Sequence, residues 1–171
     1  DVLLTNYGPD RLYLNDGKGH FQDVSQVAGI TSSGWANSAA FCDYDRDGRL
    51  DLFITQYGSE AFDAHKRACD YGGGHVGYCS PLEFNPSTDV LFHNEGPGPD
   101  QVVRFRDVTT SAGIDSERAK GTGFCVVPAD FNGDGWPDFY VANDMYPNRL
   151  WINQQDGTFQ DQGLQTGSAY N

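Results

Sequence analysis

Short stretches rich in β-branched and aromatic residues recur along this chain, and turns rich in glycine, aspartate and asparagine separate them. Three of these stretches, at residues 1–7, 51–57 and 138–144, each begin with aspartate and continue with a largely apolar run. Runs of this kind, bounded by turn residues, are typical of β-strands. We therefore interpret the three stretches as equivalent strands of one repeat.

Three further sets of matching stretches complete the repeat. Strands are predicted at residues 11–15, 90–94 and 149–153, at 21–24, 105–108 and 159–161, and before two acidic loops, around 38–42 and 123–127. Turns such as Asn15-Asp16-Gly17 are typical of hairpins. Four short strands per repeat predict propeller blades. We therefore predict an all-β fold of about three four-stranded blades, which belong to a larger β-propeller because closed propellers have about 4–8 blades.

The two acidic loops, at residues 43–51 and 130–138, follow the pattern D-x-[DN]-x-D-G-x-x-D. Oxygen ligands at alternate positions of a tight turn suit calcium, which takes six to eight oxygens in flexible geometry. Gly48 and Gly135 stand at the sixth position, where the chain must turn sharply. The predicted ligands, with a main-chain carbonyl at the seventh position, are Asp43, Asp45, Asp47, Arg49 and Asp51 in the first loop, and Asp130, Asn132, Asp134, Trp136 and Asp138 in the second.

The residues after the loops decide between calcium motifs. An EF-hand carries a glutamate at position twelve, where this chain has Ile54 and Val141. Strands are predicted on both sides of each loop, so the EF-hand and dockerin motifs are excluded. An acidic, solvated turn is the alternative, but it leaves several carboxylates to repel one another without a cation.

The spacing of the repeat locates an insertion. Asp1 and Asp51 lie 50 residues apart, whereas Asp51 and Asp138 lie 87 apart, and most of the excess falls between Tyr57 and Val90. We expect a partial blade at 1–35, a blade at 36–115 with loop 43–51 and the insertion 58–89, and a blade at 116–171 with loop 130–138 and the start of the next repeat. Asp1 then ends a truncated third calcium site, and the chain is expected to be an interior segment of a longer protein.

The composition limits the possible partners. The net charge is −13, and two calcium ions would offset only part of it. The remaining acidity argues against nucleic acid or an anionic membrane as a partner, because both need a basic protein face. No apolar run of about 18 residues occurs, so no membrane span is expected.

The four cysteines fall into two groups. Cys69 and Cys79 bracket a glycine-rich part of the insertion, where we predict a disulfide that pins an otherwise structureless loop. Free thiols are one alternative. A zinc site is the other, and its ligands would be His65, Cys69, His75 and Cys79. Cys42 and Cys125 lie on the strands before the acidic loops and are interpreted as small buried residues, or as a second bridge if these strands are neighbours.

The order of loop, strand, hairpin turn and Phe-x-Asp-Val resembles the FG-GAP/VCBS-repeat superfamily of calcium-binding β-propellers, which includes integrin α-like repeats. The chain is most similar to the cartilage acidic protein (ASPIC/UnbV-type) branch. The motifs that carry the resemblance are the loop at 43–51 with Leu52, the turn from Asn15 to Val24, and Ala28-Gly29-Ile30. The resemblance implies a calcium ion in each loop, with weaker binding where Asn132-Gly133 replaces a carboxylate.

The leading functional hypothesis is a non-catalytic scaffold that is extracellular, on the cell surface or periplasmic. Calcium rigidifies its loops, and the propeller face or the insertion meets a protein or glycan partner at the cell surface or matrix. Alternatives are a lectin-like propeller, a polysaccharide-active enzyme, or a partly represented subunit of a larger assembly. Stacking rings for a sugar would be Tyr57, Phe62, Tyr71, Tyr78 and Phe84. Carboxylates for an enzyme would be Glu60, Asp63, Glu83 and Asp89, but no spacing selects a pair and no hydrolase motif occurs.

Other matching positions predict structural roles. Asn6 and Asn143 correspond to each other and are expected to hydrogen-bond the backbone beside their loops, as support for the metal ligands. Arg11 and Arg149 also correspond and predict a contact between strands. The three tryptophans are expected to fill the core between blades or to cap a loop.

Overall fold

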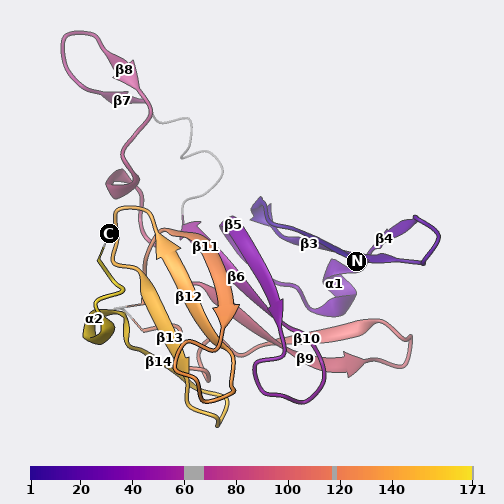
Figure 1. Cartoon of the computed structure of the whole chain (residues 1–171). Coiled ribbons are helices and arrows are strands. Elements are labelled where there is room, and N and C mark those ends of the chain that lie inside the picture. Colours follow the sequence, from indigo (N-terminus) through magenta and orange to yellow (C-terminus); the bar gives the residue numbers. More distant parts are fainter. Residues whose placement is uncertain (60–67, 117–118, 171) are drawn as a thin grey trace.

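The computed structural model describes residues 1–59, 68–116 and 119–170, and nearly all of its regular structure is β-strand (Figure 1). The strands are β1 (Val2–Leu4), β2 (Tyr7–Pro9), β3 (Arg11–Asn15), β4 (Phe21–Asp23), β5 (Ser33–Cys42), β6 (Asp51–Gly58), β7 (Cys69–Asp70), β8 (Val76–Gly77), β9 (Val90–Pro97), β10 (Val103–Asp107), β11 (Gly123–Ala129), β12 (Asp138–Asn143), β13 (Arg149–Asn153) and β14 (Phe159–Asp161). The helical turns are α1 (Ser25–Ala28), η2 (Pro81–Glu83) and α2 (Gly163–Thr166). In the described part of the chain, no helix has the length and apolar character needed to cross a membrane.

Three antiparallel sheets lie side by side, and their strand orders are β1-β3-β4, β10-β9-β6-β5-β2 and β11-β12-β13-β14. Apart from β2, each sheet follows the order of the chain, and β11 packs against β5 and β6 of the preceding sheet. Sheets built in chain order and placed side by side are the architecture of a propeller. The predicted all-β fold and the positions of its strands are therefore confirmed, whereas the blade boundaries stay predictions.

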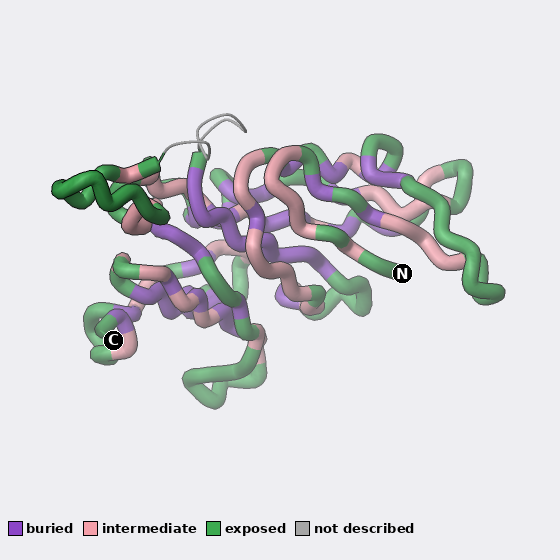
Figure 2. The backbone as a smooth tube through the Cα atoms, turned by 90° about the horizontal axis from the view of Figure 1, so that it is seen from above, coloured by how far each residue is buried: buried purple, intermediate pink, exposed green. Residues whose placement is uncertain are grey.

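β6 shows most directly how the sheets pack. All eight of its residues are buried, and successive side chains point to opposite faces. Phe53 joins the apolar cluster shared with β12 and β13, while Leu52 and Ile54 join the cluster around β3 and α1. Buried residues accordingly concentrate where the sheets face one another (Figure 2). β6 is thus the inner layer of two cores, which is what stacked propeller blades require.

The turn after the third strand of the repeat depends on a glycine. Gly29 ends α1 with a positive φ of 80°, and a Cβ at this position would lie 2.5 Å from the carbonyl oxygen of Phe105 on the neighbouring sheet. An alanine here would therefore be strained and would also clash with backbone. Gly29 of the Ala-Gly-Ile motif therefore allows two neighbouring sheets to come into close contact.

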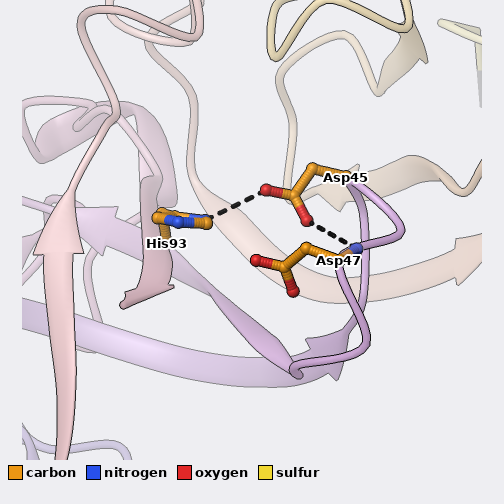
Figure 3. A group of neighbouring side chains, drawn as sticks. All are labelled: Asp45, Asp47 and His93. Atoms are coloured by element: carbon orange, nitrogen blue, oxygen red, sulfur yellow. Dashed lines mark hydrogen bonds and ion pairs between the residues drawn. The ribbon is translucent and has the colours of Figure 1, made fainter. Parts of the chain in front are cut away.

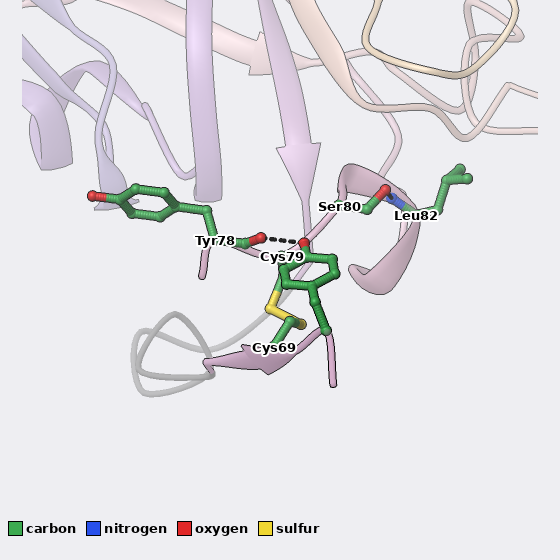
Figure 4. The surroundings of a disulfide bond; sticks show 6 residues. Cys69, Tyr78, Cys79, Ser80 and Leu82 are labelled. Carbon is green, nitrogen blue, oxygen red and sulfur yellow. Dashed lines mark hydrogen bonds between the residues drawn. A yellow bond between two sulfur atoms is a disulfide. The ribbon is translucent and has the colours of Figure 1, made fainter. Parts of the chain in front are cut away.

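The insertion leaves the sheets after β6 and returns at β9. Its described part carries the small hairpin β7–β8, which projects away from the three sheets (Figure 1), and the turn η2. A disulfide between Cys69 and Cys79 closes the base of this hairpin (Figure 4), so the predicted bridge is confirmed. We call residues 69–79 the disulfide arm.

Candidate metal centre

The first acidic loop connects β5 to β6 and is shaped by its own carboxylates. Asp43 accepts hydrogen bonds from the backbone N–H groups of Asp47 and Gly48, both at 3.0 Å. The N–H of Asp47 also lies 3.2 Å from Asp45 Oδ1, and Asp47 Oδ1 accepts from the N–H of Arg49 at 2.9 Å. These bonds fold the alternate carboxylates of the loop toward one side.

Asp51, the last predicted ligand, lies at the buried start of β6 and is 1% exposed. Its two carboxylate oxygens accept from the backbone N–H groups of Tyr44, at 3.2 Å, and Asn94, at 2.8 Å. Burial is the main cause that raises the pKa of Asp51 to about 6, and the charge of Asp45 adds to it. A bound cation would oppose this shift, because it favours the ionised carboxylate.

Three carboxylates of this loop converge as a metal site requires. One oxygen from each of Asp43, Asp45 and Asp51 lies within 4.8 Å of the others. Oxygens bound at 2.3–2.6 Å to one calcium ion are separated by at most about 5 Å, so the three residues fit a single ion. Asp47 is held beside them by an ion pair with Arg49. The loop can therefore hold a calcium ion through Asp43, Asp45 and Asp51.

The second loop, between β11 and β12, has the same backbone pattern. Asp130 accepts from the N–H groups of Asp134, at 3.1 Å, and Gly135, at 2.8 Å. Asp138 is fully buried and accepts from the N–H groups of Phe131, at 2.9 Å, and Asn153, at 2.8 Å. The repeated motif therefore produces a repeated loop conformation.

The two loops differ in how their carboxylates are arranged. Asp134 points Oδ2 toward two amide groups, those of Asn132 at 2.9 Å and Gln155 at 3.1 Å. Its hydrogen bond from the N–H of Trp136 is the main cause that lowers its pKa. The position of Asp45 is taken here by Asn132, so the three carboxylates that converge in the first loop correspond to only two acidic residues in the second, Asp130 and Asp138. The weaker binding expected from Asn132 stays a prediction.

Direct contacts join the two loops to each other. Asn153, which binds Asp138 through its N–H, donates from its side chain to the carbonyl of Tyr44 at 2.9 Å. The N–H of Tyr44 in turn binds Asp51, so a short chain of hydrogen bonds links the last ligands of both loops. The guanidinium of Arg46 also lies 5.3 Å from the ring centre of Trp136. Trp136 thus caps a loop as predicted, and Trp151 fills the core.

The sequence prediction chose the wrong asparagines as support for the loops. The side-chain amide of Asn143 donates to the carbonyl of Pro147, at the opposite end of β12 from Asp138, and Asn6 binds the carbonyl of Pro9 in the equivalent turn. Asn94 and Asn153 brace the loops instead, because their side-chain amides donate to the loop carbonyls of Leu50, at 2.8 Å, and Pro137, at 3.0 Å, and their backbone N–H groups donate to Asp51 and Asp138. The sequence could have identified them, because an asparagine ends each of the equivalent strands, at Asn15, Asn94 and Asn153.

Asp1 occupies the place predicted for it in the register. Its Oδ1 accepts from the N–H of Asn15 at 2.9 Å, which repeats the contacts of Asp51 with Asn94 and of Asp138 with Asn153. The arginine prediction is also confirmed, since Arg11 pairs with Asp23 at 3.3 Å, and Arg149 pairs with Asp161 at 3.2 Å.

The remaining candidates are resolved as follows. The disulfide removes Cys69 and Cys79 from any zinc site. Cys125 is exposed, not buried as predicted, because it lies on the face of β11 that no described element covers, and neither it nor Cys42 forms a disulfide. Asp89 is buried and accepts from the N–H of Gln56 at 2.9 Å, which assigns it a structural role. Glu60, Phe62, Asp63 and His65 lie outside the described residues.

Among the predicted stacking rings that the structure describes, only those of the disulfide arm are free to meet a ligand. Tyr57 is buried and its hydroxyl donates to Asp144 at 2.8 Å, while Phe84 packs edge-on against Trp35 at 5.4 Å. Tyr71 and Tyr78 are 65% and 98% exposed. The arm therefore presents the accessible aromatic surface of the described part of the insertion.

Sheets in chain order and repeated acidic loops define a β-propeller built from loop-bearing repeats. The family profile for FG-GAP-like repeats matches residues 1–54 and 130–171, and the chain therefore belongs to this family. It is similar to cartilage acidic protein 1 of Homo sapiens, with 27% identity over 165 residues that cover 76% of this chain and 24% of that protein. The protein of the same name from Mus musculus has the same identity and coverage. The chain thus spans about a quarter of the length of these relatives.

Proposed function

We propose that this chain is part of a calcium-stabilised, non-catalytic β-propeller scaffold that acts outside the cell, at the cell surface or in the periplasm. The convergence of Asp43, Asp45 and Asp51 carries the calcium assignment. The disulfide agrees with an oxidising compartment, since such bonds persist in secreted and periplasmic proteins. Calcium is millimolar outside cells, where extracellular modules bind it with dissociation constants of about 10⁻⁴–10⁻³ M.

The stabilisation that calcium should give can be calculated from mass action. At a concentration about twenty times the dissociation constant, one site adds about 2 kcal/mol to the free energy of unfolding. For a domain of this size, that corresponds to a melting temperature about 4–8 °C higher. The first loop should supply more of this gain than the second, because it has a carboxylate, Asp45, where the second loop has the neutral Asn132.

Thermal melts in excess calcium and in excess chelator test the proposal. We expect the chelated protein to melt several degrees lower, and Asp45→Asn, which copies Asn132 of the second loop, to lose part of the calcium-dependent difference. Asp156→Asn is the matched control, because Asp156 is exposed and lies outside both loops. Identical melts with calcium and chelator would refute calcium stabilisation.

The partner is proposed to dock on the disulfide arm. The arm projects from the sheets (Figure 1), is closed by a covalent bond, and exposes Tyr71, Val76 and Tyr78. Aromatic side chains with little conformational freedom are frequent anchors of protein interfaces. A glycan is the second candidate partner, since the same tyrosines can stack on sugar rings. Glycan-array binding that depends on Tyr78 would favour this candidate, whereas a protein partner predicts no glycan signal.

A further inference from the structure

Tyr44, the second residue of the first acidic loop, shows how neighbouring sheets are joined. It is 4% exposed, and its ring centre lies 5.5 Å from that of Phe159 on the next sheet. Its N–H donates to Asp51 at 3.2 Å, and its carbonyl accepts from the side chain of Asn153 at 2.9 Å. The ring of His93, which Figure 3 shows directed toward the loop, lies edge-on to Tyr44 at 6.4 Å. Two sheets therefore hold this one residue, through its backbone and its ring.

A groove beside β1 and β3 repeats the surroundings of Tyr44 one sheet earlier. The residues around Tyr44 are Asp51, Leu91, His93, Asn153 and Phe159, and their equivalents in the preceding copies are Asp1, Leu12, Leu14, Asn94 and Phe105. All five equivalents line a single groove of about 510 Å³, whose other lining is largely apolar. The groove therefore has the shape and the chemistry of a seat for one aromatic residue, and it is open in the described part of the chain.

A polar group of the groove has fewer contacts than its equivalent. The side chain of Asn153 donates to two carbonyls, those of Tyr44 and Pro137. Among the described residues, the side chain of Asn94 donates to one carbonyl, that of Leu50, which is the counterpart of Pro137. Asn94 therefore keeps an amide N–H for one further carbonyl, at the place where Asn153 binds the second residue of a loop.

The edge of β1 offers a place for the strand that leads into such a loop. β6 lies between β5 and β9, and β12 lies between β11 and β13, whereas β1 pairs with β3 alone among the described strands. β5 runs along β6 and continues directly into the first acidic loop, so it carries Tyr44 to its seat. A free strand edge can bind a further extended segment through main-chain hydrogen bonds. The open edge and the groove therefore fit one and the same segment.

We propose that this groove is the docking site for the strand and acidic loop of a further FG-GAP-like repeat. The strand pairs with β1, and the second residue of the loop is seated between Leu14 and Phe105. This residue is aromatic, because both loops of this chain carry an aromatic residue there, Tyr44 and Phe131. A second copy of the chain is a poorer occupant, since it would have to detach β5 from β6 to supply the strand. The inference goes beyond the proposed function, because it needs neither the disulfide arm nor a bound ion.

A chain extended by a copy of residues 36–50 in front of Asp1 tests the proposal. The copy ends with Leu50, so Asp1 takes the place of Asp51 and completes an acidic loop. Tyr44→Ala in the added copy alone removes the ring. Tyr44→Phe in the added copy is the matched control, because it reproduces Phe131 and leaves the charge of the loop unchanged. Thermal melts are recorded in calcium and in chelator, and the two variants differ only in the seated side chain.

We expect the extension to raise the melting temperature by about 4–8 °C, the effect of burying one aromatic side chain in a protein of this size. Tyr44→Phe should keep this gain and Tyr44→Ala should lose most of it, both in calcium and in chelator. Leu14→Glu, which places a charge in the groove, should abolish the gain. Val27→Glu should not, because Val27 is exposed on α1 outside the groove.

An extension that leaves the melting temperature unchanged, or that gives equal gains with alanine and phenylalanine, would overturn the inference. Sedimentation of the unextended chain tests the other occupant. Self-association that Leu14→Glu abolishes and the extension does not would assign the groove to a second copy, and would also overturn it. Identical melts of the unextended chain in calcium and chelator would refute the proposed calcium role and leave this inference standing.

Discussion

Asp89 is the buried carboxylate whose replacement gives the sharpest test of the repeat. It is 5% exposed and its Oδ1 accepts from the N–H of Gln56 at 2.9 Å. Asn148 stands at the equivalent place in the next repeat, is equally buried, and accepts from the N–H of Asn143 at the same distance. An amide therefore performs the same hydrogen bond without a charge. We predict that Asp89→Asn stabilises the protein at neutral pH.

The sign follows from the pKa. Burial raises the pKa of Asp89 to about 7. The hydrogen bond from Gln56 and the charge of Arg149 lower the pKa, but they offset only part of this rise. The native state therefore holds a proton that the unfolded chain has lost, from about pH 4 up to about pH 7. Across this window the contribution of Asp89 to stability falls as the pH rises, and above it the loss stays constant.

The size of the effect follows from the same shift. A rise of about three pKa units corresponds to an upper limit of about 4 kcal/mol at high pH, of which about 2–3 kcal/mol develops between about pH 5 and pH 7.5. The new amide N–H₂ must replace an acceptor in a buried place, and this costs about 1 kcal/mol or more. We expect a net gain of about 1–3 kcal/mol at pH 7.5 that shrinks toward zero near pH 5.

Denaturant unfolding of the parent and of Asp89→Asn from pH 5 to pH 8 measures this difference in the free energy of unfolding. The mirror variant, Asn148→Asp, should be destabilised at pH 7.5 and should recover toward pH 5. A constant difference between Asp89→Asn and the parent across this range would show that the carboxylate is not protonated in the fold. The electrostatic argument would then be wrong, even if the hydrogen bond is real.

Three further predictions concern the contacts between repeats. Asn153→Ala should lower the free energy of unfolding by about 2–4 kcal/mol, because it leaves the buried carbonyl of Tyr44 without its donor. Asn94→Ala should lower it less in the same denaturant assay, because the side chain of Asn94 donates within its own repeat, to Leu50. Gly29→Ala should cost more than about 2 kcal/mol, whereas Gly19→Ala, with a similar φ of 88° but no atom within 4 Å of the new Cβ, should cost about 1 kcal/mol; equal losses would contradict the close contact with Phe105. Replacing Cys69 and Cys79 together by serine should speed proteolysis of the arm and leave the melting temperature of the sheets almost unchanged, since the arm unfolds locally; a large drop in melting temperature would show that the arm supports the core.

Much of the fold was predictable because the same sequence pattern occurs in several copies of the repeat. Strand positions, the acidic loops and the hairpin turns each occur in more than one copy, so an error in one copy is corrected by another. The disulfide was predictable for a different reason, because a glycine-rich segment between two cysteines closes easily. Pairing of β2 with β5 was not predictable, since Tyr7–Pro9 is too short to carry a pattern of its own.

The details of the site depended on contacts between distant segments. Loop ligands follow from local spacing, but Asn94 reaches Asp51 across 43 residues, and Asn153 reaches Tyr44 across 109. His93 lies far from the first loop in the sequence, yet its Nδ1 is 3.2 Å from Asp45 and from Asp51. Cys125 was predicted to be buried because its strand is apolar, yet only one face of β11 is covered by described residues. Periodicity assigns residues to faces, but it does not show which face another element covers.

The carboxylate at the end of each loop explains why loop and fold cannot be separated. Asp51 and Asp138 each bind two backbone N–H groups, one within the loop and one on the following strand of the sheet. Each residue therefore fixes the loop to its sheet whether or not an ion is bound, and offers a cation only its remaining lone pairs. Replacing it removes a structural brace together with a ligand. Asp45 is the better probe of metal binding, because its contacts stay within the loop and with His93. A loss of stability in Asp45→Asn that disappears in chelator therefore measures the ion alone, which no variant of Asp51 can do.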